Sequence, residues 1–253
     1  MKEVLFFIRV SFCVVACFVA QNIFASNADP AVSAAEIIQK AVTRAKVAET
    51  EVKPEYALVQ TTTTEERDSQ GQVKDRNQKA EEVRFSCGRM VKAGEPAEKK
   101  RDSAKLSLKN SSRSDFINLL TPELIGKYIF SFVTRTNVNG RDAFELSFRP
   151  CSKNLPGKEL TDKIMNQAKG RLWIDAEEFE LVRAQVRVDS EVPVAGFLGA
   201  LKRAAFSMER VRLETGLWLE RFYKTDYESR KLLECKRVIT ESEFSNFRRV
   251  NRG

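Results

Sequence analysis

The sequence predicts an α+β protein that consists mainly of antiparallel sheet, with one long helix near its N-terminus. An apolar stripe at three- and four-residue steps predicts the helix over residues 31–50. Runs in which apolar and polar residues alternate predict strands with one buried face, and short polar turns separate these runs in pairs. The succession of hairpins favours a meander that the single helix is long enough to cover.

The N-terminus has the pattern of a secretory signal peptide. Lys2 and Arg9 flank an apolar start, residues 10–20 are all apolar or small, and small residues follow at Ala25 and Ala28. A charged region, an apolar core and a small-residue cleavage site define such peptides. We therefore expect export, with cleavage after Ala25 or Ala28.

Two other interpretations of this segment stay open. An uncleaved membrane anchor is disfavoured because the apolar run is shorter than the ~20 residues that span a bilayer. A lipoprotein would carry its lipid on Cys17. The expected organisation is a signal peptide at 1–25 and a single domain at 29–253, a length that buries a substantial core.

The charge of the chain indicates anionic partners. Its 253 residues carry a formal net charge of +8. Because an exported protein rarely meets nucleic acid, we expect an anionic membrane surface or an acidic envelope partner, and no nucleic acid. A soluble surface with a basic bias is the plain alternative.

The expected helix begins after Asp29-Pro30, where aspartate can cap the first turn and proline suits it, and it ends before Pro54. Its apolar stripe is made of Ala34, Ile37, Ile38, Ala41, Val42 and Ala45. We expect this stripe to lie against an apolar face of the sheet.

A short helix and seven further strands complete the expected secondary structure. A short helix is expected near the end of the loop 150–168. Besides the hairpin discussed next, the expected strands are 55–67, 73–91, 170–175, 179–192, 203–214, 216–227 and 232–249.

In the hairpin over residues 128–149 apolar side chains alternate with polar ones, and its turn decides which side chains share a face. A two-residue loop Asn139-Gly140 would pair Phe132 with Ser147, which sets an aromatic ring against a polar group. A three-residue loop with Gly140 in the left-handed conformation pairs Phe132 with Leu146 instead. We therefore predict the three-residue loop, with one face formed by Phe130, Phe132, Phe144, Leu146 and Phe148.

The segment 192–206 is the most apolar stretch after the N-terminal region, with Pro193 near its start and two glycines inside. It is too short to span a membrane. It suits a short helix or flap over an apolar mouth, with Phe197, Leu198 and Leu201 as lid residues, or else a helix that fills the core.

Residues that carry chemistry are scarce. The chain has no histidine, which removes Ser-His and Cys-His nucleophile pairs and the usual zinc ligands. After cleavage three cysteines would remain, so an oxidising compartment permits one disulfide among Cys87, Cys151 and Cys235, with no preferred pair. The acidic turn 175–178 is interpreted as a surface turn, and no glycine-rich phosphate loop is present. We expect no catalytic residues, no metal and no cofactor.

Three runs, in order, carry a resemblance to a known family: NGRDAFELSFRP, GRLWIDAEEFELVRAQVRV and LETGLWLERFYKTDYESRKLL. With the helix before them, they resemble the LolA/LolB-like periplasmic proteins described as outer-membrane lipoprotein-sorting proteins, over most of residues 31–249. The resemblance implies a half-open antiparallel β-barrel wrapped on the N-terminal helix, with short helical lid inserts. It also implies a cavity for acyl chains and no chemistry.

The leading hypothesis is a non-enzymatic, monomeric periplasmic carrier that shelters the acyl chains of a lipoprotein or lipid and meets transport partners at the membranes. Its candidate lining residues are Phe130, Phe132, Phe144, Leu146, Phe148, Phe197, Leu198 and Leu201. The alternative is an envelope protein-interaction or stress-sensing module without lipid transport, and a hydrolase is third. A large apolar cavity would favour the carrier.

Overall fold

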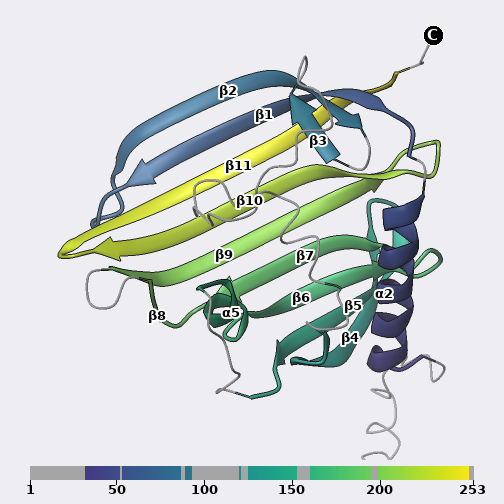
Figure 1. Cartoon of the computed structure of the whole chain (residues 1–253), viewed down its shortest axis with the longest axis horizontal. Coiled ribbons are helices and arrows are strands. Elements are labelled where there is room, and N and C mark those ends of the chain that lie inside the picture. Colours follow the sequence, from purple (N-terminus) through teal and green to yellow (C-terminus); the bar gives the residue numbers. More distant parts are fainter. Residues whose placement is uncertain are drawn as a thin grey trace, which may run out of the picture. The chain divides into compact units, whose positions relative to one another are not determined.

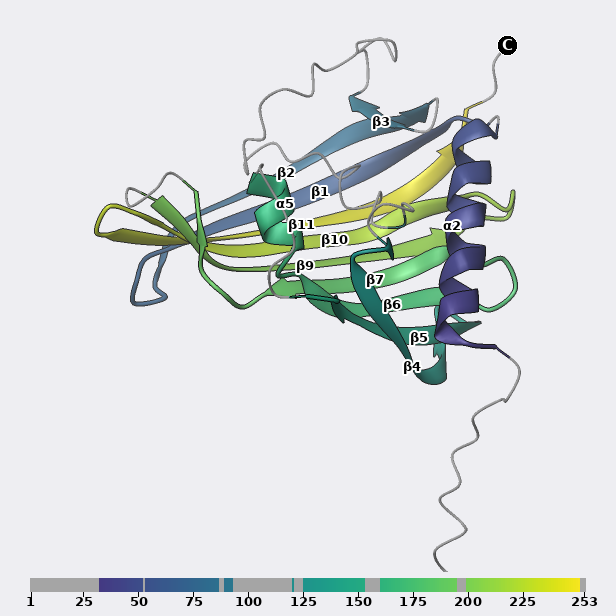
Figure 2. The same cartoon turned by 60° about the horizontal axis from the view of Figure 1, so that its bottom comes forward.

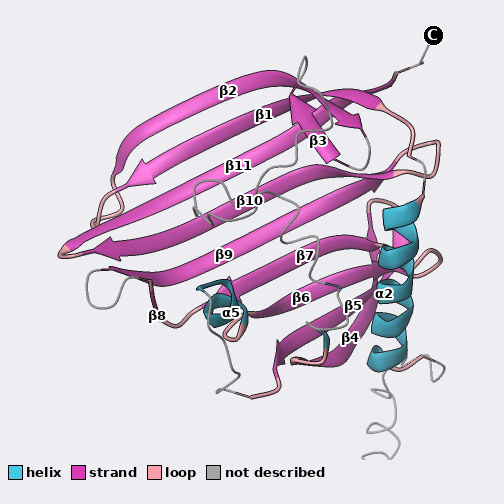
Figure 3. Cartoon of the chain, in the orientation of Figure 1, coloured by secondary structure: helices cyan, strands magenta, loops and turns pink. Residues whose placement is uncertain are grey.

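Strands form one antiparallel sheet in the computed structural model (Figure 1; Figure 3). The structure describes residues 32–51, 53–86, 89–92, 120, 125–152, 160–194 and 199–250. The expected signal peptide lies outside these residues. The strands are β1 (Tyr56–Arg67), β2 (Val73–Ser86), β3 (Arg89–Lys92), β4 (Tyr128–Val138), β5 (Arg141–Pro150), β6 (Lys169–Asp175), β7 (Leu181–Val188), β8 (Val192–Pro193), β9 (Gly199–Arg212), β10 (Trp218–Lys231) and β11 (Glu234–Arg249).

The order of strands is β3-β2-β1-β11-β10-β9-β7-β6-β5-β4, and the short β8 pairs with β9. A long meander runs from β4 to β11, and the N-terminal hairpin then joins it because β1 pairs with β11. Among the described residues β3 and β4 each have one strand neighbour, so the sheet is open. The prediction of a mainly antiparallel, unclosed sheet with one long helix is confirmed.

Helix α2 (Ala34–Thr50) begins later than the sequence suggested. Ser33, not Asp29, is the N-cap, and its hydroxyl accepts a hydrogen bond from the backbone N–H of Glu36 at 3.2 Å. The chain turns extended at Glu51, ahead of Pro54. The buried part of the expected stripe is Ile37, Ile38, Ala41 and Val42.

Helix α2 lies across one end of the strands, on the same side of the sheet as the short helix α5 (Leu160–Met165) (Figure 2). An ionic contact ties α2 to the sheet: Arg44 Nε donates to Glu180 Oε1 at 2.9 Å, and Arg210 reaches the other oxygen at 3.0 Å. Because Glu180 is buried, these two arginines supply the counter-charge that its burial requires. None of the described helices is both long and apolar enough to cross a membrane.

The β4–β5 hairpin has the predicted pairing of its aromatic residues, but its turn differs from the predicted one. Its turn is a two-residue loop, Asn139-Gly140, with φ of 53° and 82°, and Val138 pairs with Arg141. The predicted three-residue loop is therefore wrong. A bulge at Val133 shifts the register by one residue, so that Phe132 still pairs with Leu146 and Phe130 with Phe148. The predicted apolar face is thus restored by a bulge within the strand.

The helix or flap predicted over 192–206 is also wrong where the structure describes it. Residues 192–193 form β8 and residues from Gly199 onward belong to β9. Leu201 is 1% exposed and pairs with Val192. The other two proposed lid residues, Phe197 and Leu198, lie outside the described residues.

Two of the cysteines that follow the expected cleavage site are placed. Cys151 is exposed, Cys235 is half-buried, and both are free thiols. Cys87 lies outside the described residues.

Candidate functional site

Strands β5 to β9 bury a continuous apolar face beneath α2 and α5. Cross-strand pairing places Leu146 beside Leu172, then Ala184, then Met208, one residue from each successive strand. All four side chains are at most 3% exposed. Alternation along each strand brings these residues to one side of the sheet, since side chains two apart share a face.

The next row of the same face is Phe148, Gly170, Val186 and Phe206. A Cβ atom at Gly170 would lie 1.9 Å from the carbonyl oxygen of Gln185, so only glycine fits there.

Aromatic rings gather where this face meets the edge strand β4. Tyr128 lies edge-on to Phe148 with ring centroids 5.4 Å apart, Phe130 is 6.2 Å from Phe148, and Phe132 is 6.4 Å from Phe144. The hydroxyl of Tyr128 donates to the carbonyl of Met165 in α5 at 2.5 Å, and burial raises the pKa of Tyr128 to about 12. We call Tyr128, Phe130, Phe132, Phe144 and Phe148 the aromatic cluster.

The aromatic cluster leads from the core to the surface. Phe144 and Phe148 are buried, Phe130 is half-buried, and Phe132 is 37% exposed. On the same strand Ile129 and Val133 are also exposed. The cluster is therefore an apolar path that ends in solvent at the open edge of the sheet.

The structure brings together five of the eight predicted lining residues. The four phenylalanines Phe130, Phe132, Phe144 and Phe148 belong to the aromatic cluster, and Leu146 lies between Phe144 and Phe148 on the same face. Leu201 is five residues from Phe206 along β9, about 16 Å away in an extended strand. It belongs to the core beside β8 and not to the aromatic cluster.

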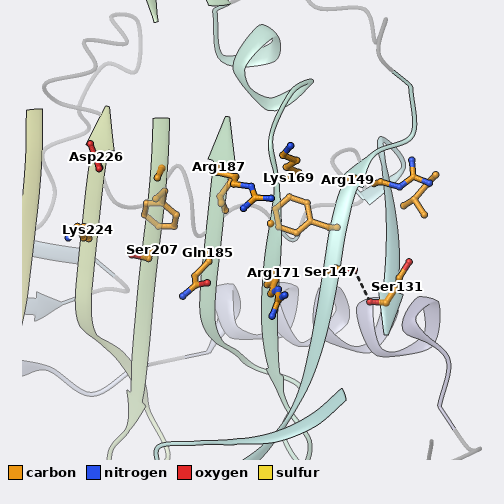
Figure 4. Close-up of a pocket in the computed structure, with 16 residues that line it drawn as sticks. Ser131, Ser147, Arg149, Lys169, Arg171, Gln185, Arg187, Ser207, Lys224 and Asp226 are labelled. Atoms are coloured by element: carbon orange, nitrogen blue, oxygen red, sulfur yellow. Dashed lines mark hydrogen bonds between the residues drawn. The ribbon is translucent and has the colours of Figure 1, made fainter. Parts of the chain in front are cut away.

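The opposite face of the same strands holds a groove of about 590 Å³ (Figure 4). Its lining side chains alternate with those of the apolar face: Ser147 lies between Leu146 and Phe148, and Gln185 between Ala184 and Val186. The groove is thus on the face away from α2. Its lining includes Ser131, Ser147, Arg149, Lys169, Arg171, Gln185, Arg187, Ser207, Lys224 and Asp226.

Five of these lining residues are basic, and we call the site the cationic groove. Arg149, Lys169 and Arg187 come from the adjacent strands β5, β6 and β7, and Lys169 pairs directly with Arg187 in the sheet. The sequence did not reveal this group, because the three residues are dispersed and meet only through the register. The signal present was basic residues at alternate positions in 169–171 and 183–187.

Carboxylates offset the charge of the cationic groove only in part. Lys169 and Arg187 share one partner, Asp189, at 2.9 and 3.3 Å. Asp226, the acid in the lining, is already held by two hydrogen bonds from Arg237, which together with its charge lower the pKa of Asp226. Among the described residues, Arg149 has no carboxylate partner.

A buried ion pair stands at the α2 end of this polar face. Asp175 is 1% exposed and accepts hydrogen bonds from Arg141 at 2.7 and 3.0 Å and from the backbone N–H groups of Glu177 and Glu178. Burial opposes ionisation of Asp175, but these hydrogen bonds outweigh it, so its pKa is lowered. The interpretation of this turn as a surface turn therefore does not hold for Asp175.

The two faces of the sheet carry side chains that suit the binding of ligands. No group of three or more Cys, Asp or Glu side chains in the described part of the chain is placed to hold a metal ion. Apolar rings on one face offer van der Waals contact, and cations with hydroxyl groups on the other offer hydrogen bonds to anions.

Solved structures resemble this fold, although no family model and no curated protein sequence matches the chain. A DUF1329 family protein from Desulfovibrio piger is 13% identical, with a TM-score of 0.40, over 86% of this chain and 93% of that one. A LolA superfamily protein from Nitrosomonas europaea is 12% identical, with a TM-score of 0.33, over 88% and 96%. A putative outer membrane lipoprotein-sorting protein domain from Vibrio parahaemolyticus is 14% identical, with a TM-score of 0.36, over 84% and 91%.

The resemblance expected from the sequence thus recurs among solved structures. With TM-scores of 0.33–0.40, this likeness concerns the fold alone. The chain is similar in structure to LolA-superfamily and lipoprotein-sorting proteins.

Proposed function

We propose that this chain is a non-enzymatic periplasmic binding or carrier protein that shelters an acyl chain against the aromatic cluster. The observation that supports the proposal is the gradient of exposure along the rings, from buried Phe148 through half-buried Phe130 to exposed Phe132. An acyl chain that enters at the edge strand would meet apolar side chains along its whole path.

The energetics favour such a ligand. Each CH₂ group that leaves water contributes about 0.8 kcal/mol, so a chain of ten or more carbons supplies useful affinity without specific polar contacts. The exposed ring of Phe132 loses its own contact with water at the same time. The expected signal peptide is the reason to place this activity in the periplasm, and the acyl chain could belong to a lipoprotein or to a free lipid.

Two measurements test the proposal. Mass spectrometry of protein purified under native conditions should find co-purifying lipid, and a fluorescent acyl probe should bind to the delipidated protein. Phe132→Glu should weaken probe uptake at least tenfold, because a carboxylate would have to be desolvated beside the ligand. Since Phe132 is 37% exposed, the variant should stay folded, with a stability loss of about 1 kcal/mol or less.

Leu233→Glu is the matched control, because it introduces the same charge at a leucine that is 99% exposed in the β10–β11 turn. It should bind the probe like the wild type. Lipid-free protein that takes up no probe would refute the proposal, as would a folded Phe132→Glu variant with unchanged uptake.

The open edge of β4 favours a second candidate, a protein-interaction module. β4 has one strand neighbour among the described residues and exposes Ile129, Phe132 and Val133. An unpaired edge with apolar side chains accepts a strand from another chain. This candidate predicts that no lipid co-purifies, and that a bound polypeptide protects the amides of β4 from hydrogen exchange.

A further inference from the structure

The cationic groove has a feature that packing alone does not account for. In cross-strand pairing, like charges placed directly opposite one another destabilise a sheet. Lys169 and Arg187 are direct partners in the β6–β7 ladder, and Arg149 extends the row onto β5. The three Cα atoms span two strand spacings, about 10 Å, which is within the reach of these long side chains.

The carboxylates nearby leave this row short of negative charge. Asp189 serves both Lys169 and Arg187, and Arg149 has no carboxylate partner in the described part of the chain. Lys224 and Arg171, farther along the groove, are paired with Glu241 and Glu145. A site with unbalanced positive charge and a concave shape is complementary to an anion.

The shape of the groove and its hydrogen-bond donors indicate a small ligand with anionic oxygens. Its volume of about 590 Å³ is that of a small-molecule site, whereas a bilayer surface would require no cavity. Hydroxyl groups of Ser147 and Ser207 lie among the cations, and that of Ser131 lies at the edge strand (Figure 4). Guanidinium forks and hydroxyl donors together suit the several oxygens and the two negative charges of a phosphate.

We propose that the cationic groove is a binding site for a phosphate-bearing ligand, held by Arg149, Lys169 and Arg187. The ligand is either a soluble phosphorylated molecule or the phosphate of a lipid headgroup. The three cations alternate with the residues of the apolar face, so they point away from the aromatic cluster, which shares only Phe148 with the lining of the groove. Binding would relieve the like-charge row, so the protein should be more stable when the groove is occupied.

The test uses inorganic tripolyphosphate as the soluble probe, measured by titration calorimetry at low ionic strength. The wild type should bind it saturably, and added salt should weaken the affinity. The double variant Arg149→Gln/Arg187→Gln should bind roughly 100-fold more weakly, since each charge-assisted hydrogen bond accounts for about a factor of ten. Its uptake of the acyl probe should not change.

A matched control removes the same charge elsewhere. Arg84→Gln/Lys74→Gln changes two exposed cations on β2, which lies beyond β1 and β11 from the groove strand β10. It should bind tripolyphosphate like the wild type. Equal losses in both double variants would show that net charge alone is responsible, and would overturn the proposal.

Vesicles distinguish the two sources of phosphate. Co-sedimentation with phosphatidylcholine vesicles that contain phosphatidylglycerol, lost in Arg149→Gln/Arg187→Gln and competed by tripolyphosphate, would assign the site to a headgroup. Binding of tripolyphosphate without co-sedimentation would assign it to a soluble ligand. Failure of the wild type to bind either probe would overturn the proposal, whatever the acyl probe does.

Thermal unfolding separates a ligand site from a structural role. If the basic row only stabilised the sheet, Arg149→Gln should lower the melting temperature. The proposal expects an equal or higher melting temperature for this variant, together with weaker binding of tripolyphosphate.

Discussion

Away from the α2 end, the two faces of strands β5, β6 and β7 differ as much as the core and the surface of a protein, although they share one backbone. Toward α2 both faces are buried, because Ala143 and Trp173 belong to a second apolar cluster on the groove side. Leu146 and Leu172 are paired neighbours on one face, while Ser147 and Arg171 are the neighbouring pair on the other. The leucines are at most 2% exposed, and Arg171 is exposed. A single sheet thus carries the aromatic cluster on one face and the cationic groove on the other, with only the backbone of the strands between them.

This difference shows that alternate residues of one strand can serve two separate surfaces. Because side chains point to opposite faces with a period of two, a change at one position alters one face and leaves the other nearly untouched. Variants of adjacent residues are therefore natural controls for each other.

Leu146→Ala should destabilise the protein by about 2–5 kcal/mol, because it leaves a cavity under a side chain that is 0% exposed. Gln185→Ala, on the groove face of β7, should change the free energy of unfolding by less than about 0.5 kcal/mol. Urea denaturation of both variants measures the contrast. Similar losses would mean that the two faces do not differ as the structure shows.

Asp175→Asn should cost about 3 kcal/mol, since it leaves the Arg141 guanidinium without its buried counter-charge. Glu177→Gln is the control on the same arginine: Glu177 accepts from Arg141 at 2.9 Å but is largely exposed, so its loss should cost at most about 1 kcal/mol. Chemical denaturation at neutral pH compares the two. Equal losses would mean that Asp175 acts only as a surface charge.

The pH dependence gives an independent check on Asp175. Its pKa is lower in the folded protein than the ordinary value of 3.8, so the stabilisation is fully present above that value and is lost as pH falls through the folded pKa. The stability difference between wild type and Asp175→Asn should be constant near neutral pH and should shrink in acid below about pH 4. A difference that persists in acid would contradict an ionised Asp175.

The strands were predictable from the sequence, and their assembly was not. Alternation located β5, β6 and β7 to within a few residues, because apolar residues recur at every second position along them. The pairing of β1 with β11 joins residues about 180 positions apart, which no local pattern encodes. For the same reason the basic row became visible only when the register brought three strands together.

Two local errors have physical reasons as well. The segment 192–206 is apolar without a clear period, and such runs do not distinguish a helix from a buried strand. The burial of Asp175 depends on Arg141, which is 34 residues away in the sequence. The conformation of 192–206 and the burial of Asp175 both depend on contacts with residues that are distant in the sequence.

The bulge at Val133 permits the most delicate test of the two faces. Asn139 and Gly140 both adopt positive φ, which favours the two-residue turn, while the ring contacts favour pairing of Phe132 with Leu146. One extra residue in β4 reconciles these preferences. Deleting Val133 should therefore keep every ring contact and cost less than about 1 kcal/mol.

Deleting Ser131 shortens the same strand by the same amount, but it moves Phe130 and Tyr128 to the groove face while Phe132 stays in place. The contacts of both rings with Phe148 would be lost, at about 0.5–1.5 kcal/mol for each aromatic pair. Thermal unfolding should rank the deletion of Val133 as milder than that of Ser131. The opposite order would mean that the bulge itself, and not the shared face of the rings, holds β4 in register.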